Sequence, residues 1–358
     1  MFGNSWHKKE KPLPTIIGLG GGATGLSQDI VKAVLEATGG STVEPGNGYK
    51  YHVFTSPGSF DITPATIPAV PTGTYEVLIV GGGGCGGFSA DSVSGGGGAG
   101  GIVHYTGFPL PAGNQDVVIG PGQSVDGNNA GPDNGATSGT DTTFGPPTVG
   151  RTFAKGGGSG AEGANNSNGT WKSPGRAGGS GGGGIGYIGS GAKYSPGGPG
   201  TQPAQSLIPG AGGTNYGNDG SDGGPSGDKG GGGGGAGGSS SAPTNENGGN
   251  GQPFPSFASP LISPLIPGPA ATAIGPTGLF GGGGAASGGG PPYGTGGPGG
   301  GGPFPSDAWS PTRPAPNRGL GDAATGYGSG GSGSQVGAAN ALDSAAGAPG
   351  IVIIRYLY

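Results

Sequence analysis

Long runs of consecutive glycine are the feature that most limits how this chain folds. The longest covers residues 230–235 and continues as Ala236-Gly237-Gly238. Shorter runs of the same kind occupy residues 81–84, 95–98, 156–158, 181–184, 281–284, 288–290 and 299–302. A single run is typical of a flexible linker. Many runs, separated by proline-rich and aromatic-bearing inserts, indicate a repeated structural element.

The ordered form open to oligoglycine is the polyproline-II helix, which has about three residues per turn and no internal hydrogen bonds. Its N–H and C=O groups point outward, so in a buried helix they need partners on neighbouring helices. Such helices pack closely only where the inward positions carry no Cβ. We therefore predict a bundle of polyglycine-II helices, in which Ala236 is a tolerated side chain. The glycines assigned to the bundle core are Gly182, Gly232, Gly234, Gly282 and Gly300.

The composition leaves low-complexity disorder as an alternative. Glycine and proline, at 99 and 36 of 358 residues, exceed the roughly 25–30% that is typical of disordered chains. However, only 9% of the residues are charged and the net charge is −5, whereas disorder usually accompanies a high net charge. Apolar residues make up 30% of the chain, which is too few for a conventional core. Backbone hydrogen bonds are therefore expected to carry much of the stability.

Several classes of protein are disfavoured by simple features. No apolar stretch reaches the roughly 18 residues of a membrane span, so we expect no membrane insertion. The first residues lack the apolar segment of a signal peptide. The mild acidity argues against nucleic acid as a partner. Cys85 is the only cysteine, so no intrachain disulfide can form.

The first 48 residues differ from the rest of the chain. Residues 1–26 read as an extended arm that contains Trp6, and such an arm usually needs a partner surface to be ordered. Residues 27–38 predict a short helix that is capped by Ser27 and stopped by Gly39. The helix either docks on its own domain or binds a larger assembly. The candidate residues for docking on a particle are Trp6, Ile30, Val34 and Leu35.

From residue 49 the apolar pattern changes to the period of two that is typical of strands. Strands are predicted at residues 49–54, 59–62, 75–80, 101–105, 115–119 and 151–155. The segment 350–358 is the most apolar and most β-branched in the chain, and we expect it to return to the sheet that contains residues 75–80. The predicted fold class is mainly β and irregular, with a short helix, a small β domain and a polyglycine-II bundle with long loops.

Four regions follow from this pattern: a docking arm and helix at 1–48, a β domain at 49–155, the bundle at 156–349 and a closing strand at 350–358.

Aromatic rings in glycine-, serine- and proline-rich inserts are typical of adaptable binding surfaces. Each ring either covers the side of the bundle or contacts a ligand. The candidate receptor contacts are Trp171, Tyr187, Tyr194, Tyr216, Tyr293 and Trp309.

Two glycine motifs resemble catalytic signatures without their context. Residues 81–86 fit a dinucleotide fingerprint, but no helical pattern follows to hold a pyrophosphate. Residues 178–182 fit a nucleophile elbow, but they lack the strand and helix that would expose Ser180. Cys85 has no basic neighbour in sequence to activate it. We therefore expect no enzyme activity, no cofactor and no metal.

The chain resembles the glycine-rich domain of bacteriophage tail proteins and is similar to the glycine-rich tail-fibre adhesins of T-even-type phages. The resemblance covers residues from about 54 to 356. It rests on the entry motif Phe54-Thr-Ser-Pro-Gly-Ser-Phe60, the strand and glycine run at 75–84, the later glycine blocks, and the exit strand 349–356. It implies a polyglycine-II sandwich whose distal loops bind a receptor on the bacterial surface. Residues 1–48 have no counterpart in that pattern.

These observations predict a phage virion protein that presents loops for host recognition. Residues 1–40 would bind other virion proteins, and the inserts would bind a protein or glycan receptor. Such a protein would assemble in the host cytoplasm and lie exposed on the tail or capsid, and a homo-oligomer is compatible with the sequence. A capsid decoration or capsid fibre protein is one alternative. A secreted glycine-rich or ice-binding protein is another.

Overall fold

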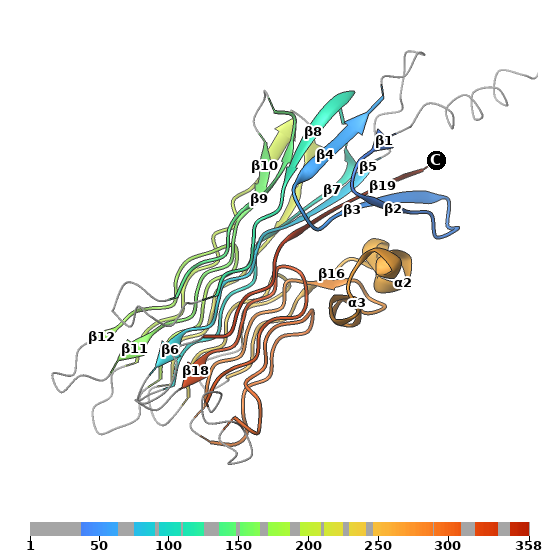
Figure 1. Cartoon of the computed structure of the whole chain (residues 1–358). Helices are drawn as coiled ribbons and strands as arrows, with labels where there is room; N and C mark the ends of the chain where they lie inside the picture. Colours follow the sequence, from blue (N-terminus) through green and yellow to red (C-terminus); the bar gives the residue numbers. More distant parts are fainter. Residues whose placement is uncertain are drawn as a thin grey trace, which may run out of the picture.

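The computed structural model covers the whole chain. It describes residues 37–63, 75–89, 93–108, 110–124, 136–147, 151–164, 171–186, 194–208, 211–224, 229–240, 246–288, 290–308, 319–335 and 344–357. The described residues form a mainly β and irregular fold, as the sequence predicts. Two sheets lie at one end, and a bundle of extended glycine-rich runs leads away from them to the other end (Figure 1).

The first sheet has six strands in the order β15-β7-β5-β19-β3-β2. Their bounds are Ser41–Val43 for β2, Tyr49–Phe54 for β3, Tyr75–Val80 for β5, Ile102–Phe108 for β7, Thr214–Tyr216 for β15 and Ile351–Leu357 for β19. The closing strand β19 lies between β3 and β5 and is antiparallel to both, with Ile353 opposite Val53 and Leu78. Pairing with β5 is the arrangement expected from the sequence.

The second sheet has five strands in the order β1-β4-β8-β9-β10. Their bounds are Ala37–Thr38 for β1, Gly58–Ile62 for β4, Gly113–Val118 for β8, Thr142–Gly145 for β9 and Thr152–Ala154 for β10. Strand β1 corrects the predicted helix at its end, because Ala37 and Thr38 pair with Ile62 and Asp61 of β4 instead of extending a helix. The rest of that helix lies outside the described residues.

The two sheets enclose one apolar core, and the six-stranded sheet carries a second core on its other face. Alternate residues of β19 pack into the two cores on opposite faces of the sheet. Val352, Ile354 and Tyr356 pack in the first core, together with Phe60 and Phe144 of the five-stranded sheet. Ile351 and Ile353 face the second core. Because both faces of β19 are covered, the strand reads as a continuous apolar run.

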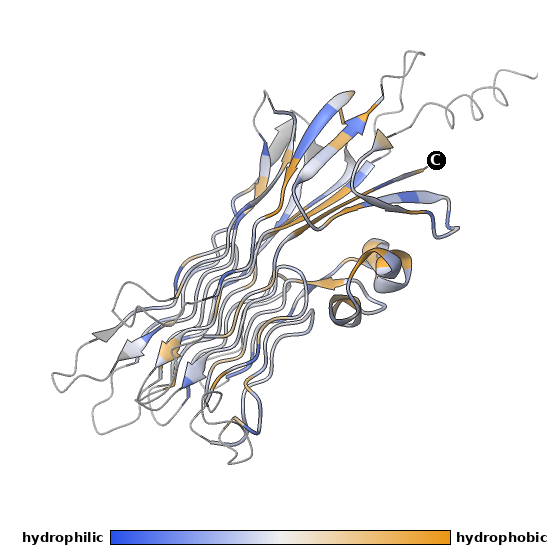
Figure 2. Ribbon diagram, viewed as in Figure 1, coloured by the Kyte–Doolittle hydropathy of each residue, from blue (hydrophilic) through white to orange (hydrophobic). Residues whose placement is uncertain are grey.

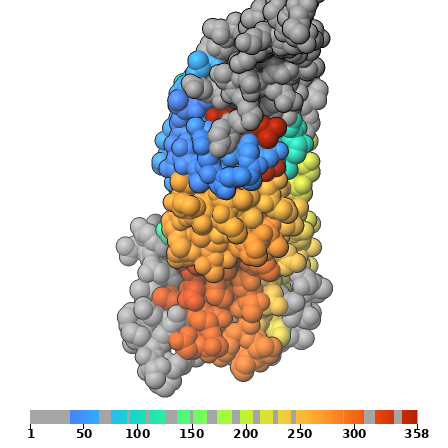
Figure 3. All heavy atoms as spheres, turned by 90° about the vertical axis from the view of Figure 1, so that its right-hand side faces the viewer, coloured from blue at the N-terminus to red at the C-terminus, as the bar shows by residue number. Residues whose placement is uncertain are grey.

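A short helical segment covers the second core. It comprises η2 (Pro255–Phe257), α2 (Ser259–Ile262), η3 (Ser263–Leu265) and α3 (Gly268–Ile274). Phe257, Ile262 and Ile274 from this segment are fully buried against the sheet. Residues 156–349 were predicted to form the bundle with its long loops, so a helical cover within this range is a correction. In Figure 3 it forms a continuous surface beside the residues of β2–β4.

Small ladders complete the fold. A four-stranded sheet in the order β12-β11-β6-β18 lies at the far end of the bundle (Figure 1). Its bounds are Phe88–Ser89 for β6, Gly163–Ala164 for β11, Trp171–Lys172 for β12 and Ser334–Gln335 for β18. Two antiparallel pairs join β13 (Ser206–Ile208) to β14 (Ala211–Gly212) and, across the helical cover, β16 (Gln252–Pro253) to β17 (Leu279–Phe280).

The hydropathy of the chain divides in the same way as its structure. Apolar residues gather in the two sheets and the helical cover, whereas the glycine-rich runs are nearly neutral along their length (Figure 2). The bundle therefore has little side-chain hydrophobicity with which to hold itself together. Among the described residues, no helix has the length and apolar character that a bilayer crossing requires.

Candidate functional site

The glycine-rich bundle is the scaffold of the candidate site, and its hydrogen bonds repeat every three residues. The run 95–101 illustrates this in the interior. Its N–H groups donate in rotation to three neighbouring runs, with N···O distances of 2.7–3.2 Å. The partners are the run 155–161 for Gly95, Gly98 and Gly101, the run 231–234 for Gly96 and Ala99, and the run 328–331 for Gly97 and Gly100.

The carbonyl groups of the same run accept from three further neighbours. Donors to it come from the run 81–87 at Gly81, Gly84 and Gly87, from the run 180–183 at Ser180 and Gly183, and from Gly284. The interior run therefore has six neighbours, and both polar groups of its backbone are used. A period of three with outward-pointing bonds is the geometry of packed polyproline-II helices. Buried backbone thus finds its partners without a sheet or an α-helix.

The predicted core glycines occupy positions without space for a side chain. A Cβ on Gly182, Gly232, Gly234 or Gly282 would lie within 3.0 Å of a backbone carbonyl oxygen on another run. Gly300 adds a second constraint, because its φ of +96° is one that L side chains rarely adopt. Each of these glycines is therefore required by a neighbouring backbone.

Some interior positions hold a small side chain. Ala236 is buried and its N–H donates to the carbonyl of Gly281. Ser94 donates its hydroxyl to the carbonyl of Gly87 at 3.0 Å and lies 3.2 Å from the hydroxyl of Ser287. Cys85 lies beside Thr137, whose N–H donates to the sulfur at 3.1 Å. Burial raises the pKa of the Cys85 thiol to about 11, so it is a weak nucleophile at neutral pH.

The two apparent catalytic motifs are both parts of this bundle. The run that begins at Gly81 leads into strand β6, and the described residues that follow at 93–101 are not helical. Ser180 is fully buried, and its hydroxyl accepts from the N–H of Asn218. Within the described ranges, His, Cys, Asp and Glu side chains form no group of three that could hold a metal.

At the perimeter of the bundle, side chains replace the missing neighbour. Asp141 accepts from the N–H of Gly156 at 2.8 Å, and Asn247 accepts from the N–H of Thr295 at 2.7 Å. Proline serves the same purpose at outward positions, since it has no N–H to satisfy. Exposed prolines of this kind are Pro121, Pro174, Pro196, Pro199, Pro298 and Pro349.

Three of the predicted receptor contacts, Trp171, Tyr194 and Tyr293, are described and lie outside the two large sheets. Trp171 belongs to β12, the outer strand of the small sheet at the far end of the bundle. Tyr194 is 50% exposed, and the next residue, Ser195, accepts from the N–H of Ile185. Tyr293 packs against Phe304, with 5.8 Å between the ring centroids. Tyr187 and Trp309 lie outside the described residues.

Tyr216 does not belong with these residues. It lies in β15, on the six-stranded sheet, and its ring meets Phe254 edge-on with 5.5 Å between the centroids. The ring is partly buried against the second core, so Tyr216 lies on the sheet and apart from the other predicted contacts. The predicted docking residues Trp6, Ile30, Val34 and Leu35 all lie outside the described residues.

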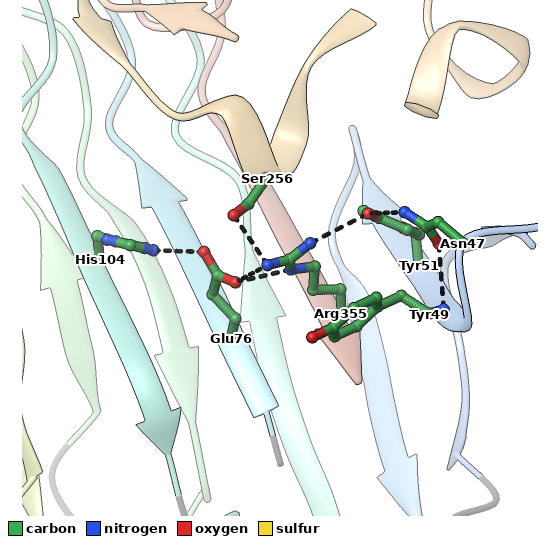
Figure 4. A network of polar contacts seen from close by, with 7 residues as sticks. All are labelled: Asn47, Tyr49, Tyr51, Glu76, His104, Ser256 and Arg355. Atoms are coloured by element: carbon green, nitrogen blue, oxygen red, sulfur yellow. Dashed lines mark hydrogen bonds and ion pairs between the residues drawn. The ribbon is translucent and has the colours of Figure 1, made fainter. Parts of the chain in front are cut away.

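A polar network that the sequence did not reveal links the sheet to the helical cover (Figure 4). Arg355 donates through Nε to Glu76 at 2.6 Å and through Nη2 to the Ser256 hydroxyl at 2.8 Å. His104 lies 2.9 Å from the other oxygen of Glu76. Despite its burial, Glu76 has a lowered pKa, because His104 and Arg355 stabilise the carboxylate. The network therefore holds Ser256 of the cover to strands β5 and β19.

Glu246 is a second buried carboxyl, and it lies within the bundle. Only 3% of the residue is exposed, and Oε1 has no hydrogen-bond partner. The carboxyl lies against the backbone of Gly288, while the main-chain carbonyl of Glu246 accepts from Ala286. Burial raises the pKa of Glu246 to about 7, and the charge of Lys229 opposes this shift.

Comparison with known proteins supports the sequence analysis at the level of the domain. Residues 55–258 match the family model described as a glycine-rich domain, and this match covers more than half of the chain. It includes most of the strands and the first half of the bundle. No curated protein matches the chain.

Proposed function

Because the chain belongs to the glycine-rich domain family, we propose that it is a bacteriophage virion protein that presents loop inserts for recognition of the host surface. The observation that carries this proposal is the separation of the two ends. The two large sheets, which include strand β1, lie at one end, whereas β6 and β12 lie at the other (Figure 1).

The scaffold suits a presenting role because its order does not depend on the inserts. Neighbouring runs bond through backbone groups, as Gly97 does to Gly331 and Gly84 does to Gly98. The inserts contribute no bond to these pairs, so their sequences are free to serve contact with a receptor. Tyr194 is half exposed, and tyrosine is enriched among the residues that dominate binding energy.

Attachment to the particle would use the opposite end. Strand β1 pairs with β4 on the outer side of the five-stranded sheet, so residues 1–36 join the described fold there. We propose that these residues bind other virion proteins. Deleting 1–36 while keeping β1 should leave a folded domain that is missing from purified particles. Normal incorporation of the deleted chain would refute this assignment.

The recognition role is tested with Tyr194→Ala in particles that carry the protein. We expect the adsorption rate to host cells to fall by at least about tenfold, which corresponds to a hot-spot loss of about 1.4 kcal/mol. Leu357→Ala is the matched control, since Leu357 is 51% exposed but lies at the end of β19 on the sheet. Equal adsorption by the two variants, with unchanged thermal unfolding, would contradict the proposal.

A further inference from the structure

The run 195–201 is a polyproline-II helix on the perimeter of the bundle. Residues three positions apart form a row along the helix, and the three rows have different surroundings. One row faces inward. Its N–H groups, from Ser195, Gly198 and Thr201, donate to the carbonyls of Ile185, Gly182 and Gly178 at 2.7–3.1 Å. This row fixes the run to the bundle along its full length, so its conformation is set before any partner binds.

The second row is satisfied by carboxylates from the neighbouring run 217–224. Gly197 donates to Asp222 at 2.9 Å, and Gly200 donates to Asp219 at 2.7 Å. The third row points outward and consists of Pro196 and Pro199, which are both exposed. These prolines stand one turn apart, about 9 Å along the helix. Together they form a ridge of two pyrrolidine rings.

An outward proline suits the edge of the bundle because it has no N–H to satisfy. This role explains one outward proline in a run but does not by itself require a second proline one turn later. Other described perimeter runs carry one exposed proline, and the residue three positions before or after it is not a proline. Pro298 follows Thr295, Pro349 follows Ala346, and Pro121 precedes Ser124. Ser124 and Ala346 show that edge positions tolerate residues with an N–H. Two successive prolines therefore indicate a surface that is shaped for contact.

We propose that the ridge of Pro196 and Pro199 is a preformed ligand for a protein partner with an aromatic-lined groove. Proline-rich helices of this type bind grooves of aromatic side chains, and a preformed helix loses little conformational entropy on binding. Here the bundle supplies the order that a free peptide lacks. This surface lies on the flank of the bundle, so the inference goes beyond recognition by the inserts.

The charges around the ridge define the rim of the partner. Asp219 and Asp222 are exposed on one side, and the carboxyl of each accepts from an N–H of the ridge run. On the other side lie Arg176, which is exposed, and Lys155, whose Nζ donates to the Thr201 hydroxyl at 2.7 Å. A groove with basic groups along one rim and acidic groups along the other would match this pattern. The opposed charges would also fix the direction in which the partner binds.

Three indole compounds test the ridge directly: indole, tryptamine and indole-3-acetate. The full chain is labelled with ¹⁵N and titrated with each compound, while the amide signals of Gly197, Gly198 and Gly200 are followed by NMR. We expect saturable shifts at these amides, and tighter binding of cationic tryptamine than of indole-3-acetate. The Asp219→Asn and Asp222→Asn double variant keeps both acceptor oxygens, so it should remove the preference for tryptamine while the fold is retained.

The Pro196→Ala and Pro199→Ala double variant should weaken indole binding at least about fivefold. Pro121→Ala is the control, because it removes an exposed proline from a different perimeter run. Shifts scattered over the whole bundle, or equal binding by the double variant and the control, would overturn the proposal. If the double variant unfolds, Pro199→Ala alone and the asparagine variants still decide the outcome. Host adsorption by Tyr194→Ala reports separately on the inserts.

Discussion

Gly232 provides the sharpest test of the bundle, because a single methyl group placed there meets another backbone. A Cβ at Gly232 would lie against the carbonyl oxygen of Asn247, closer than real Cβ atoms approach any heavy atom. The run that carries Asn247 cannot move away freely. It is held through Gly248 to Thr295, through Gly249 to Gly233, and through Gly251 to Pro298, at N···O distances of 2.8–2.9 Å.

The cost of Gly232→Ala has two parts. Inserting a methyl group into a packed interior costs about 1–3 kcal/mol. If the run shifts enough to break the bond between Gly249 and Gly233, the buried groups left unpaired cost about 1–3 kcal/mol more. We therefore expect a loss of about 4 kcal/mol. With ordinary unfolding entropies per residue, this lowers the Tm of a chain of this length by about 5 °C.

Gly238→Ala is the matched control in the same segment. A Cβ at Gly238 has no heavy atom within 4 Å and no unusual φ. This substitution should be neutral or should stabilise by about 0.4–1 kcal/mol, because alanine restricts the unfolded chain. Thermal unfolding followed by calorimetry compares the two variants, and Gly232→Val should be lower still. Equal Tm values for Gly232→Ala and Gly238→Ala would refute the packed-helix interpretation.

Three further predictions concern ionisable groups. Burial raises the pKa of Glu246 to about 7, so the folded state is favoured at low pH and loses stability as the pH rises from about 4.5 to 7. Glu246→Gln should therefore raise the Tm at pH 8, and the difference in Tm from the unaltered protein should close at pH 5. A difference in Tm that is the same at both pH values would contradict this. The pKa of Glu76 is lowered, so the stability that its carboxylate contributes is present above about pH 4.5 and is lost as the pH falls through the lowered pKa. Glu76→Gln should therefore cost about 3–5 kcal/mol at pH 7 in denaturant titrations, as for a broken buried pair, and the cost should shrink steadily as the pH falls below 4.5. The pKa of the Cys85 thiol is raised to about 11, so iodoacetamide at pH 8 should label it only in denaturant, and rapid labelling of the native chain would show that the thiol is accessible.

The strands were the most predictable part of the fold, because their signal is local. The alternation in residues 49–54 and 75–80 matches β3 and β5 at both ends. The β-branched run at the C-terminal end was expected to join the sheet of residues 75–80, and its burial on both faces reflects its observed place between β3 and β5. The mainly β and irregular class followed from these strands together with the glycine runs.

The helical cover could not be recognised from local pattern. Its helices are interrupted by Pro260, Pro264, Pro267 and Pro269, and proline normally disfavours the helix interior. Here each short helix places proline within its first turn, where the missing N–H has no intrahelical partner. The burial of Phe257 and Ile262 against the sheet then stabilises helices that are too short to form alone.

The polar network was hidden for a different reason. Glu76, His104 and Arg355 lie on three different strands, and Ser256 lies on the cover. Their meeting depends on the register of β5 with both β7 and β19, which places Arg355 opposite Glu76. No spacing in the sequence encodes that register. The place of Tyr216 on the six-stranded sheet was hidden for the same reason, because its ring partner Phe254 is remote in sequence.

The proline rows are the part of the surface that the sequence could have revealed. In Ser195-Pro-Gly-Gly-Pro-Gly200 the prolines recur after three residues, which is the period of the helix that the glycines form. Within such a helix, glycine marks the rows that face another backbone and proline marks a row that faces solvent. The same reasoning separates scaffold from surface throughout the bundle: interior specificity is carried by backbone bonds and by the absence of Cβ, so outward rows and inserts can change without disturbing the interior. A protein whose contacts must vary while its framework stays constant would benefit from this division, and the proposed role in host recognition is of that kind.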